Sequence, residues 1–128
     1  TQVAVYFAHN PRPFHDGAEP AARAAAAADA QDKFWAMHDA LFEDQTGRER
    51  TQADYVRYAR RIGLDVARFK KDLADPKTAK TVEDQRELCT SNDATATPTF
   101  FINGRRVTGA KDFDQLEALI ETELAAGI

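Results

Sequence analysis

Cysteine is almost absent from this sequence, because its 128 residues include only one, Cys89. A single thiol cannot form a disulfide within the chain, and there is no C-x-x-C pair. The three histidines, His9, His15 and His38, lie in no dense ligand motif such as H-E-x-x-H. These absences exclude a zinc site of the Cys/His type, and we expect neither a metal nor a cofactor.

Long apolar runs and a strong excess of one charge are also missing. The formal net charge is -4, from 17 basic and 21 acidic residues, and the basic residues are dispersed. This distribution argues against nucleic acid or an anionic membrane as the main partner. The alanine-rich stretch at residues 21–30 is interrupted by Arg23 and Asp29 and is too short to span a bilayer.

The apolar residues that are present predict a mixed α/β chain with one core. The run V-A-V-Y-F-A at residues 3–8 is typical of a strand buried on both faces, and Pro11 and Pro13 prevent it from continuing. Apolar residues then recur at helical spacing. They predict helices that open at residue 16 or 17 and at residues 32, 51, 65 and 75, the last ending near residues 92–93. Thr51, with Asp54 three positions on, and Asp65 are the expected N-caps, and Gly63 is expected to end the helix that Thr51 opens.

The C-terminal third predicts a β-hairpin followed by a helix. Asn103-Gly104 is a strong signal for a two-residue hairpin turn, and it joins a strand at residues 99–102 to a returning strand at 105–108. Asp112 then caps a closing amphipathic helix. We therefore expect a single domain over residues 1–128, with the helices at residues 16–93 forming an insert between the first strand and the hairpin.

Few side chains suggest chemistry on their own. Cys89 lies toward the C-terminal end of its predicted helix, where the helix dipole disfavours a thiolate, so a buried structural role is favoured over a nucleophile. His38 lies beside Trp35 in the middle of a helix and is expected to be structural. His9 and His15 flank the proline-rich loop, where they either line a cleft or have no special role.

Residues 96–104, A-T-P-T-F-F-I-N-G, closely resemble the G-T-P-T-F-F-I-N-G segment of DsbA-like thiol–disulfide oxidoreductases of the thioredoxin fold. Further segments resemble that family in the same order. They are P-R-P-F-H at 11–15, A-E-P-A-A-R-A at 18–24, K-F-W-A-M-H-D-A-L-F at 33–42, and the stretch from Tyr58 to Phe69. The resemblance therefore covers essentially the whole chain.

The resemblance implies a thioredoxin-like fold with a helical insertion, and a site at Ala96, Thr97 and Pro98. In that family the proline matching Pro98 is cis and faces the active-site thiols, and the backbone of Thr97 would bond to an extended substrate segment. Ala96 stands where the family often has glycine. The implied partners are protein or peptide thiols and disulfides, and the implied location is the periplasm or cell envelope of a bacterium.

The departure from the family is the absence of its first strand and its C-x-x-C helix, since position 1 already matches the following strand. We therefore expect an incomplete domain, whose remaining sheet is one strand plus the hairpin. The family's missing strand is central, so both neighbouring edges would be bare. The chain is then a fragment of a longer protein, or a second chain fills the gap by dimerisation or strand exchange, or the two strands close onto each other.

Three functions stay open on these grounds. The favoured one is the C-terminal part of a DsbA-like oxidoreductase, whose C-x-x-C lies upstream of Thr1, so that this piece alone is inactive. The second is a redox-dead thioredoxin-like module that binds extended peptides or a partner chain. The third is a single-thiol redox centre at Cys89.

Overall fold

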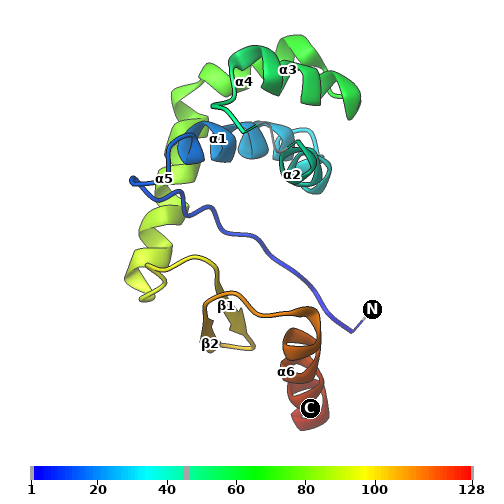
Figure 1. The fold of residues 1–128 in the computed structure, drawn as a ribbon, viewed down its shortest axis with the longest axis vertical. Helices are drawn as coiled ribbons and strands as arrows, with labels where there is room; N and C mark the ends of the chain where they lie inside the picture. The colour runs from blue at the N-terminus through cyan, green and yellow to red at the C-terminus, as the bar shows by residue number, and fades with distance from the viewer. Residues whose placement is uncertain (1, 45–46, 128) are drawn as a thin grey trace. The chain divides into compact units, whose positions relative to one another are not determined.

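A computed structural model describes residues 2–44 and 47–127 of the chain. The described residues form six helices and two strands (Figure 1). The elements are α1 (Ala18–Asp29), α2 (Phe34–Glu43), α3 (Gln52–Arg61), α4 (Val66–Ala74), α5 (Pro76–Ser91), β1 (Thr99–Ile102), β2 (Arg105–Thr108) and α6 (Phe113–Ala126).

The chain forms two compact units, and the boundary between them falls within α5. The helical unit is His9–Arg86, and the hairpin unit combines Thr1–Ala8 with Glu87–Ile128. In the helical unit, α1 packs against α2 and α4, and α3 also packs against both of these helices. In the hairpin unit, β1 contacts β2 and α6.

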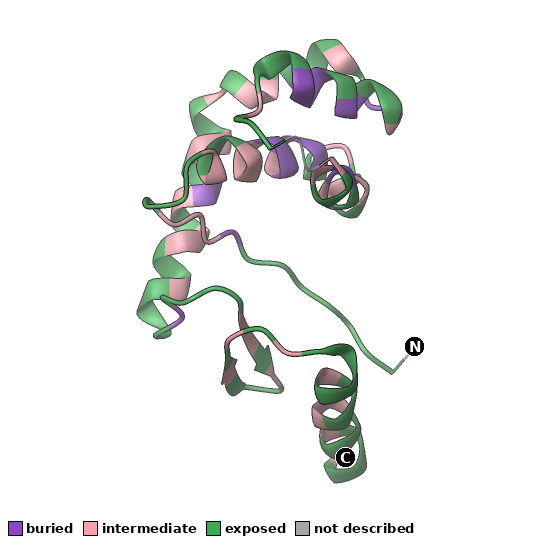
Figure 2. Ribbon diagram, in the orientation of Figure 1, coloured by how far each residue is buried: buried purple, intermediate pink, exposed green. Residues whose placement is uncertain are grey.

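The core of the helical unit depends on the alanines of α1. Their small side chains let neighbouring helices approach closely, and they face large side chains from the other helices. Figure 2 shows the buried residues concentrated on these helices, whereas the hairpin and α6 are mostly exposed. The buried cluster comprises Ala24, Ala25, Ala27, Ala28, Met37, Ala40, Tyr55, Tyr58, Ala59, Leu64 and Phe69.

Local sequence signals begin and end the helices as predicted. Thr51 and Asp54 form a reciprocal capping box at the start of α3. The carboxylate of Asp65 accepts a hydrogen bond from the Arg68 N–H and so caps α4. Gly63 follows α3 with a φ of 86°, a backbone conformation that favours glycine, so the helix ends there.

The predicted hairpin is confirmed. β1 and β2 pair antiparallel, with Phe100 opposite Val107 and Ile102 opposite Arg105. Asn103 and Gly104 both have positive φ, 50° and 84°, which is the geometry of a type I′ turn.

Replacing Gly104 with alanine is expected to destabilise the hairpin by about 1–2 kcal/mol, because the side chain disfavours a left-handed backbone. A Cβ at this position would meet no other atom within 4 Å, so the effect comes from the backbone alone. Hydrogen exchange of the β1 and β2 amides measures it. Gly104→Asn is the matched control and should cost less, since asparagine tolerates this conformation. Equal protection in the alanine variant and the wild type would contradict the assignment of the turn.

The predicted strand at residues 3–8 is wrong. The sheet in the described part of the chain contains β1 and β2 only, and residues 3–8 are drawn as a coil in Figure 1. Val5 and Tyr6 are 68% and 91% exposed. An apolar run becomes a strand only beside another backbone that completes its hydrogen bonds, and no described segment pairs with this one. The remaining sheet of the described residues is therefore the hairpin alone, and the two strands do not close onto each other.

Helix α6 forms where predicted, but its apolar face is only partly covered: Leu116, Leu119 and Ile120 are half-buried. Asp112 and Gln115 make a capping box at its start, yet none of its described residues is buried. Phe113 is 74% exposed. The amphipathic pattern thus indicates a face suited to packing that the described chain covers only in part.

Candidate functional site

The candidate site is the exposed turn of residues 96–98 that leads into β1. The Thr97–Pro98 peptide bond is cis. The Ala96 carbonyl accepts a hydrogen bond of 2.6 Å from the Thr99 hydroxyl. The Pro98 carbonyl accepts one of 2.8 Å from the Gly109 N–H, which follows β2. The carbonyls on both sides of Thr97 are therefore already occupied.

The backbone N–H and carbonyl of Thr97 are available to a ligand. Within residues 2–44 and 47–127, no hydrogen bond to its N–H or its carbonyl is formed, and the residue is exposed. It lies two residues before β1, one edge of which pairs with β2 while the other has no strand beside it in the same described ranges. An extended segment lying beside the turn would find an open donor and an open acceptor at Thr97.

The turn is anchored from both ends. Ala94, just before it, is buried, and its N–H donates to the Cys89 carbonyl at 2.8 Å. Arg106 of β2 reaches back, donating to the Asp93 carbonyl at 3.4 Å and pairing with the Asp93 carboxylate at 3.7 Å. These contacts fix the turn to the hairpin and to the end of α5.

The structure places Ala96, Thr97 and Pro98 together on this turn, while Cys89 lies upstream on α5. Cys89 is half-buried and two residues from the end of the helix, which agrees with the predicted C-terminal position. Its backbone carbonyl holds the segment that leads to the turn. The described contribution of Cys89 to the site is therefore structural support from the main chain.

The three histidines lie in different surroundings. His9 is buried against Phe34, with ring centroids 5.9 Å apart, and burial lowers its pKa while the charge of Asp29 opposes that shift. His38 packs between Trp35 and Phe42 along α2. His15 is exposed. Among the described residues, no three His, Cys, Asp or Glu side chains come together to hold a metal ion.

A polar cluster around Asp54 was not predicted from the sequence. The pattern indicated only a helix cap there, but the side chain is almost fully buried and binds two guanidinium groups. Arg48 donates to both of its oxygens at 2.8 and 3.0 Å, and Arg57 donates at 2.9 Å. Arg57 three residues later on the same helix was a visible signal, whereas Arg48 comes from the preceding loop.

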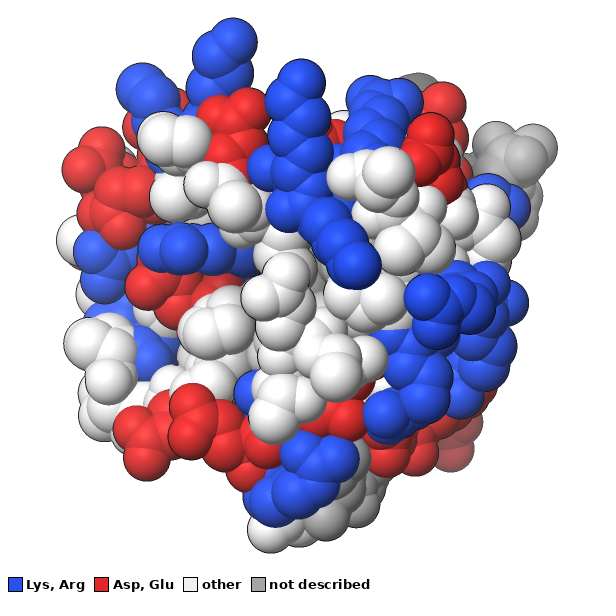
Figure 3. All heavy atoms as spheres, turned by 90° about the horizontal axis from the view of Figure 1, so that it is seen from above, with Lys and Arg blue, Asp and Glu red and all other residues white. Residues whose placement is uncertain are grey.

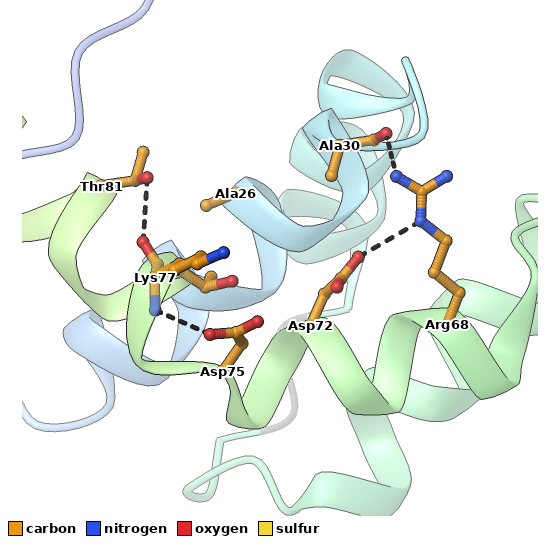
Figure 4. Close-up of a pocket in the computed structure, with 8 residues that line it drawn as sticks. Ala26, Ala30, Arg68, Asp72, Asp75, Lys77 and Thr81 are labelled. Carbon is orange, nitrogen blue, oxygen red and sulfur yellow. Dashed lines mark hydrogen bonds and ion pairs between the residues drawn. The ribbon is translucent and has the colours of Figure 1, made fainter.

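A shallow hollow at the junction of α1, α4 and α5 carries no comparable arrangement of described residues (Figure 4). Arg68 donates to the Ala30 carbonyl at 2.9 Å and pairs with Asp72 at 3.5 Å. Asp75 accepts from the Lys77 N–H at 2.9 Å. The two basic side chains that line the hollow, Arg68 and Lys77, are thus matched in number by two carboxylates, Asp72 and Asp75. The face shown in Figure 3 likewise has acidic and basic side chains interspersed.

Comparison with protein families gives a match over most of the chain. The family described as DSBA-like thioredoxin domain matches residues 3–121. A solved thioredoxin-like oxidoreductase from Silicibacter pomeroyi is 27% identical and superposes with a TM-score of 0.72, over 89% of this chain and 65% of its own. DsbA from Xylella fastidiosa superposes at 0.67 with 24% identity, over 89% and 66% of the two chains. These likenesses confirm the predicted thioredoxin-like fold.

Curated relatives are much longer than this chain. A protein named Na(+)/H(+) antiporter NhaA 3 from Salinispora tropica is 38% identical over 127 residues, which are 98% of this chain and 19% of the relative. One named Na(+)/H(+) antiporter NhaA from Herminiimonas arsenicoxydans is 39% identical over 109 residues, 85% of this chain and 17% of the relative. The chain thus spans about a fifth of their length. In the part that the structure describes, no helix has the length and apolar character to cross a membrane.

Proposed function

Because the chain belongs to the DSBA-like thioredoxin domain family, we propose that it is the substrate-binding part of a thiol–disulfide oxidoreductase that acts on protein disulfides. The observation that carries the proposal is the open main chain of Thr97 beside the open edge of β1. The cysteine pair would come from polypeptide that precedes Thr1, because the family that the sequence resembles carries its C-x-x-C ahead of the segment that residues 3–8 match.

The proposed chemistry is exchange between a cysteine pair and a substrate disulfide. A thiolate of the pair attacks one substrate sulfur, forms a mixed disulfide and releases the other substrate sulfur as a thiol. The second cysteine of the pair then attacks the mixed disulfide, so that the pair is oxidised as the substrate is reduced; the reverse sequence oxidises a substrate dithiol. Thr97 holds the substrate segment extended through its open main chain while this happens, and Ala96 and Pro98 shape the turn that presents it.

Removing the Thr97 N–H tests the binding role. In a protein that contains the cysteine pair, Thr97→Pro is expected to raise the KM for an extended peptide disulfide about three- to ten-fold with little change in kcat, as loss of one hydrogen bond implies. Thr97→Val keeps the N–H and is the matched control. Equal KM values in wild type and the proline variant, with the hairpin amides unperturbed, would rule out this role for Thr97.

The role of the missing cysteine pair is tested by insulin reduction. The chain by itself is expected to be inactive, and Cys89→Ser should leave that result unchanged. Activity of the isolated chain that disappears in Cys89→Ser would instead support the single-thiol centre. An upstream reading frame without a C-x-x-C would favour the redox-dead binding module. In that case the open main chain of Thr97 would bind extended peptides without any disulfide exchange.

A second proposal concerns the protein that carries this domain. Relatives named as Na(+)/H(+) antiporters contain a matching segment over nearly all of this chain. We propose that the domain is attached to a membrane transporter and works at the envelope side of the membrane. An antibody against this chain should detect a membrane-fraction protein several times its mass. Detection only as a small soluble protein would contradict the attachment.

The open edge of β1 also suggests how the domain is completed. We propose that preceding polypeptide, or failing that a second chain by strand exchange, lies along this edge at Thr99–Ile102 and over the exposed residues of the hairpin unit, and leaves Thr97 open to the substrate. Light scattering distinguishes these cases, because the chain alone should self-associate and the longer protein should not. A clean, stable monomer of the isolated chain that shows the complete sheet of the family would contradict the proposal.

A further inference from the structure

The charge around the candidate turn is opposite in sign to that of the chain as a whole. Residues 94–111, which contain the turn and the hairpin, include no aspartate or glutamate, and no other stretch of the sequence without an acidic residue is as long. The same residues include three basic side chains, Arg105, Arg106 and Lys111, in a chain whose net charge is -4. The open main chain of Thr97 therefore lies within a locally basic segment.

Two of the three cations adjoin the turn. The Pro98 carbonyl accepts a hydrogen bond of 2.8 Å from the Gly109 N–H, and Lys111 follows two residues after that contact. The Arg106 guanidinium reaches the Asp93 carbonyl at 3.4 Å, at the start of the segment that leads into the turn. One cation is thus placed beside the segment that enters the turn, and the other beside the segment that leaves the hairpin.

Arg105 lies at the opposite end of the hairpin. It pairs with Ile102, next to the two-residue hairpin turn, whereas Thr99 pairs with Thr108 at the end next to the candidate turn. A strand rises about 3.4 Å per residue, so three residues of β1 separate the two ends by about 10 Å, which exceeds the screening length of about 8 Å at physiological salt. Arg105 therefore carries the same charge as Arg106 without adjoining the turn.

Arg106 and Lys111 can each accept a carboxylate from a ligand. The ion pair of Arg106 with the Asp93 carboxylate is long, 3.7 Å, and the two side chains are 48% and 87% exposed, so a ligand can replace this contact at little cost. Lys111 is half-buried, and it forms no ion pair within residues 2–44 and 47–127. Asp112, which follows it, instead accepts the Gln115 N–H at 2.8 Å and caps α6.

Helix α6 of the same unit is acidic, and its effect on the turn has to be weighed. Its acidic residues are Asp114, Glu117, Glu121 and Glu123. In the part of the chain that the structure describes, none of them forms an ion pair with Arg106 or Lys111. Screening at physiological salt limits the effect of each acid to about 8 Å, so a carboxylate bound at the turn is influenced most by the cations that adjoin it.

We propose that the substrate segment bound beside Thr97 is acidic, and that Arg106 and Lys111 bind its carboxylates. This inference rests on the substrate-binding role proposed above for Thr97 and adds the class of substrate. An exposed ion pair of this kind increases affinity about two- to five-fold. A peptide is favoured over a membrane, because a lipid surface is recognised by clusters of about four to eight basic residues and only two adjoin this turn.

Binding of cysteine-free peptides to the longer protein that contains this chain tests the charge preference without disulfide chemistry. Three labelled peptides of equal length carry serine in place of cysteine, flanked by glutamates, glutamines or lysines, and fluorescence anisotropy gives their Kd values. At about 0.15 M salt the glutamate peptide should bind about four- to twenty-fold more tightly than the glutamine peptide, and the lysine peptide most weakly. The difference should shrink at about 0.5 M salt. Equal Kd values for the three peptides would overturn the proposal.

Charge variants locate the preference. Arg106→Gln and Lys111→Gln should each reduce the ratio of the glutamine-peptide Kd to the glutamate-peptide Kd by about two- to five-fold, and Arg106→Lys should retain most of it. Arg105→Gln is the matched control, because it removes the same charge at the far end of the hairpin and should leave the ratio unchanged. A reduction in Arg105→Gln as large as in Arg106→Gln would show that only net charge matters, and would overturn the assignment.

Failure of this inference is distinguishable from failure of the proposed chemistry. If the longer protein reduces peptide disulfides at equal rates whatever their charge, the oxidoreductase function is supported and the acidic substrate is overturned. If it binds the glutamate peptide through Arg106 but reduces no disulfide, the acidic ligand is supported and the oxidoreductase function is overturned. Binding to phosphatidylglycerol vesicles through Arg106, with no binding of the glutamate peptide, would overturn the inference in favour of a membrane contact.

Discussion

Replacing Phe69 with alanine is expected to lower the free energy of unfolding of the helical unit by about 3–5 kcal/mol. The side chain is fully buried on α4, in the cluster that also contains Met37 and Tyr58. Its removal forfeits the transfer free energy of a phenyl ring and leaves a cavity that close-packed helices refill only in part. Urea unfolding followed by helical circular dichroism measures the loss.

Phe14→Ala is the matched control, because Phe14 belongs to the same unit and is 71% exposed. Its ring contacts His15 and lies 5.9 Å from the Arg12 guanidinium, so the expected change is within about 0.5 kcal/mol. Since natural domains have only about 5–15 kcal/mol of stability, the Phe69 variant is expected to be near its unfolding threshold at physiological temperature. Comparable losses in the two variants would contradict the assigned core.

The second large effect is expected at Asp54. Asp54→Asn should lower the melting temperature at pH 7, on the order of 5 °C or more, because it leaves two guanidinium groups without their shared carboxylate. Arg48 and the Thr51 N–H, at 2.8 and 2.7 Å, stabilise the ionised form together with Arg57. They hold the pKa of Asp54 far below its ordinary value of 3.8, although burial acts in the opposite direction.

The lowered pKa of Asp54 determines how the stability of the helical unit depends on pH. A hydrogen bond from Tyr58 also lowers the pKa of the neighbouring Asp44, so both carboxylates bind protons more readily in the unfolded chain. Their stabilising contribution is complete above about pH 5 and is lost as the pH falls below the unfolded pKa toward the folded one. Melting curves from pH 7 to pH 2.5 should therefore show the wild type and Asp54→Asn converging in acid.

Asp84→Asn provides the control for this series. Asp84 pairs with Lys80 at 2.7 Å, but both side chains are mostly exposed, so the melting temperature should change by less than about 2 °C. Parallel curves for wild type and Asp54→Asn at all pH values would contradict the assigned carboxylate shift. If Asp84→Asn lowered the melting temperature as much as Asp54→Asn does, the burial of the Asp54 carboxylate would not explain its effect.

Signals contained within a few residues were predicted well. The Thr51–Asp54 box, the Asp65 and Asp112 caps and the Asn103-Gly104 turn all form, because each depends on backbone groups close by in the chain. The strand at residues 3–8 failed for the opposite reason. An apolar run predicts burial, but whether it is paired depends on a neighbouring strand that its own residues do not specify.

The candidate site likewise combines features that a short segment predicts with features that depend on distant residues. The segment at residues 96–104 carries enough of a family motif to locate the turn from the residues alone. Its occupied carbonyls depend on Thr99 at the start of β1 and on Gly109 beyond the hairpin, and the contact with Gly109 follows only from the register of β1 and β2. The burial of His9 and of Asp54 was missed because both depend on packing between helices and loops.

The division of the chain into a continuous unit and a discontinuous one has a consequence for its synthesis. All residues of the unit His9–Arg86 are consecutive, so they are available together once this stretch has left the ribosome. The other unit joins Thr1–Ala8 to Glu87–Ile128 and must wait for the last helix to be translated. Nascent chains in which residue 86 has just emerged should therefore already protect α1 to α4 from protease, while the first apolar residues stay accessible for a chaperone to bind.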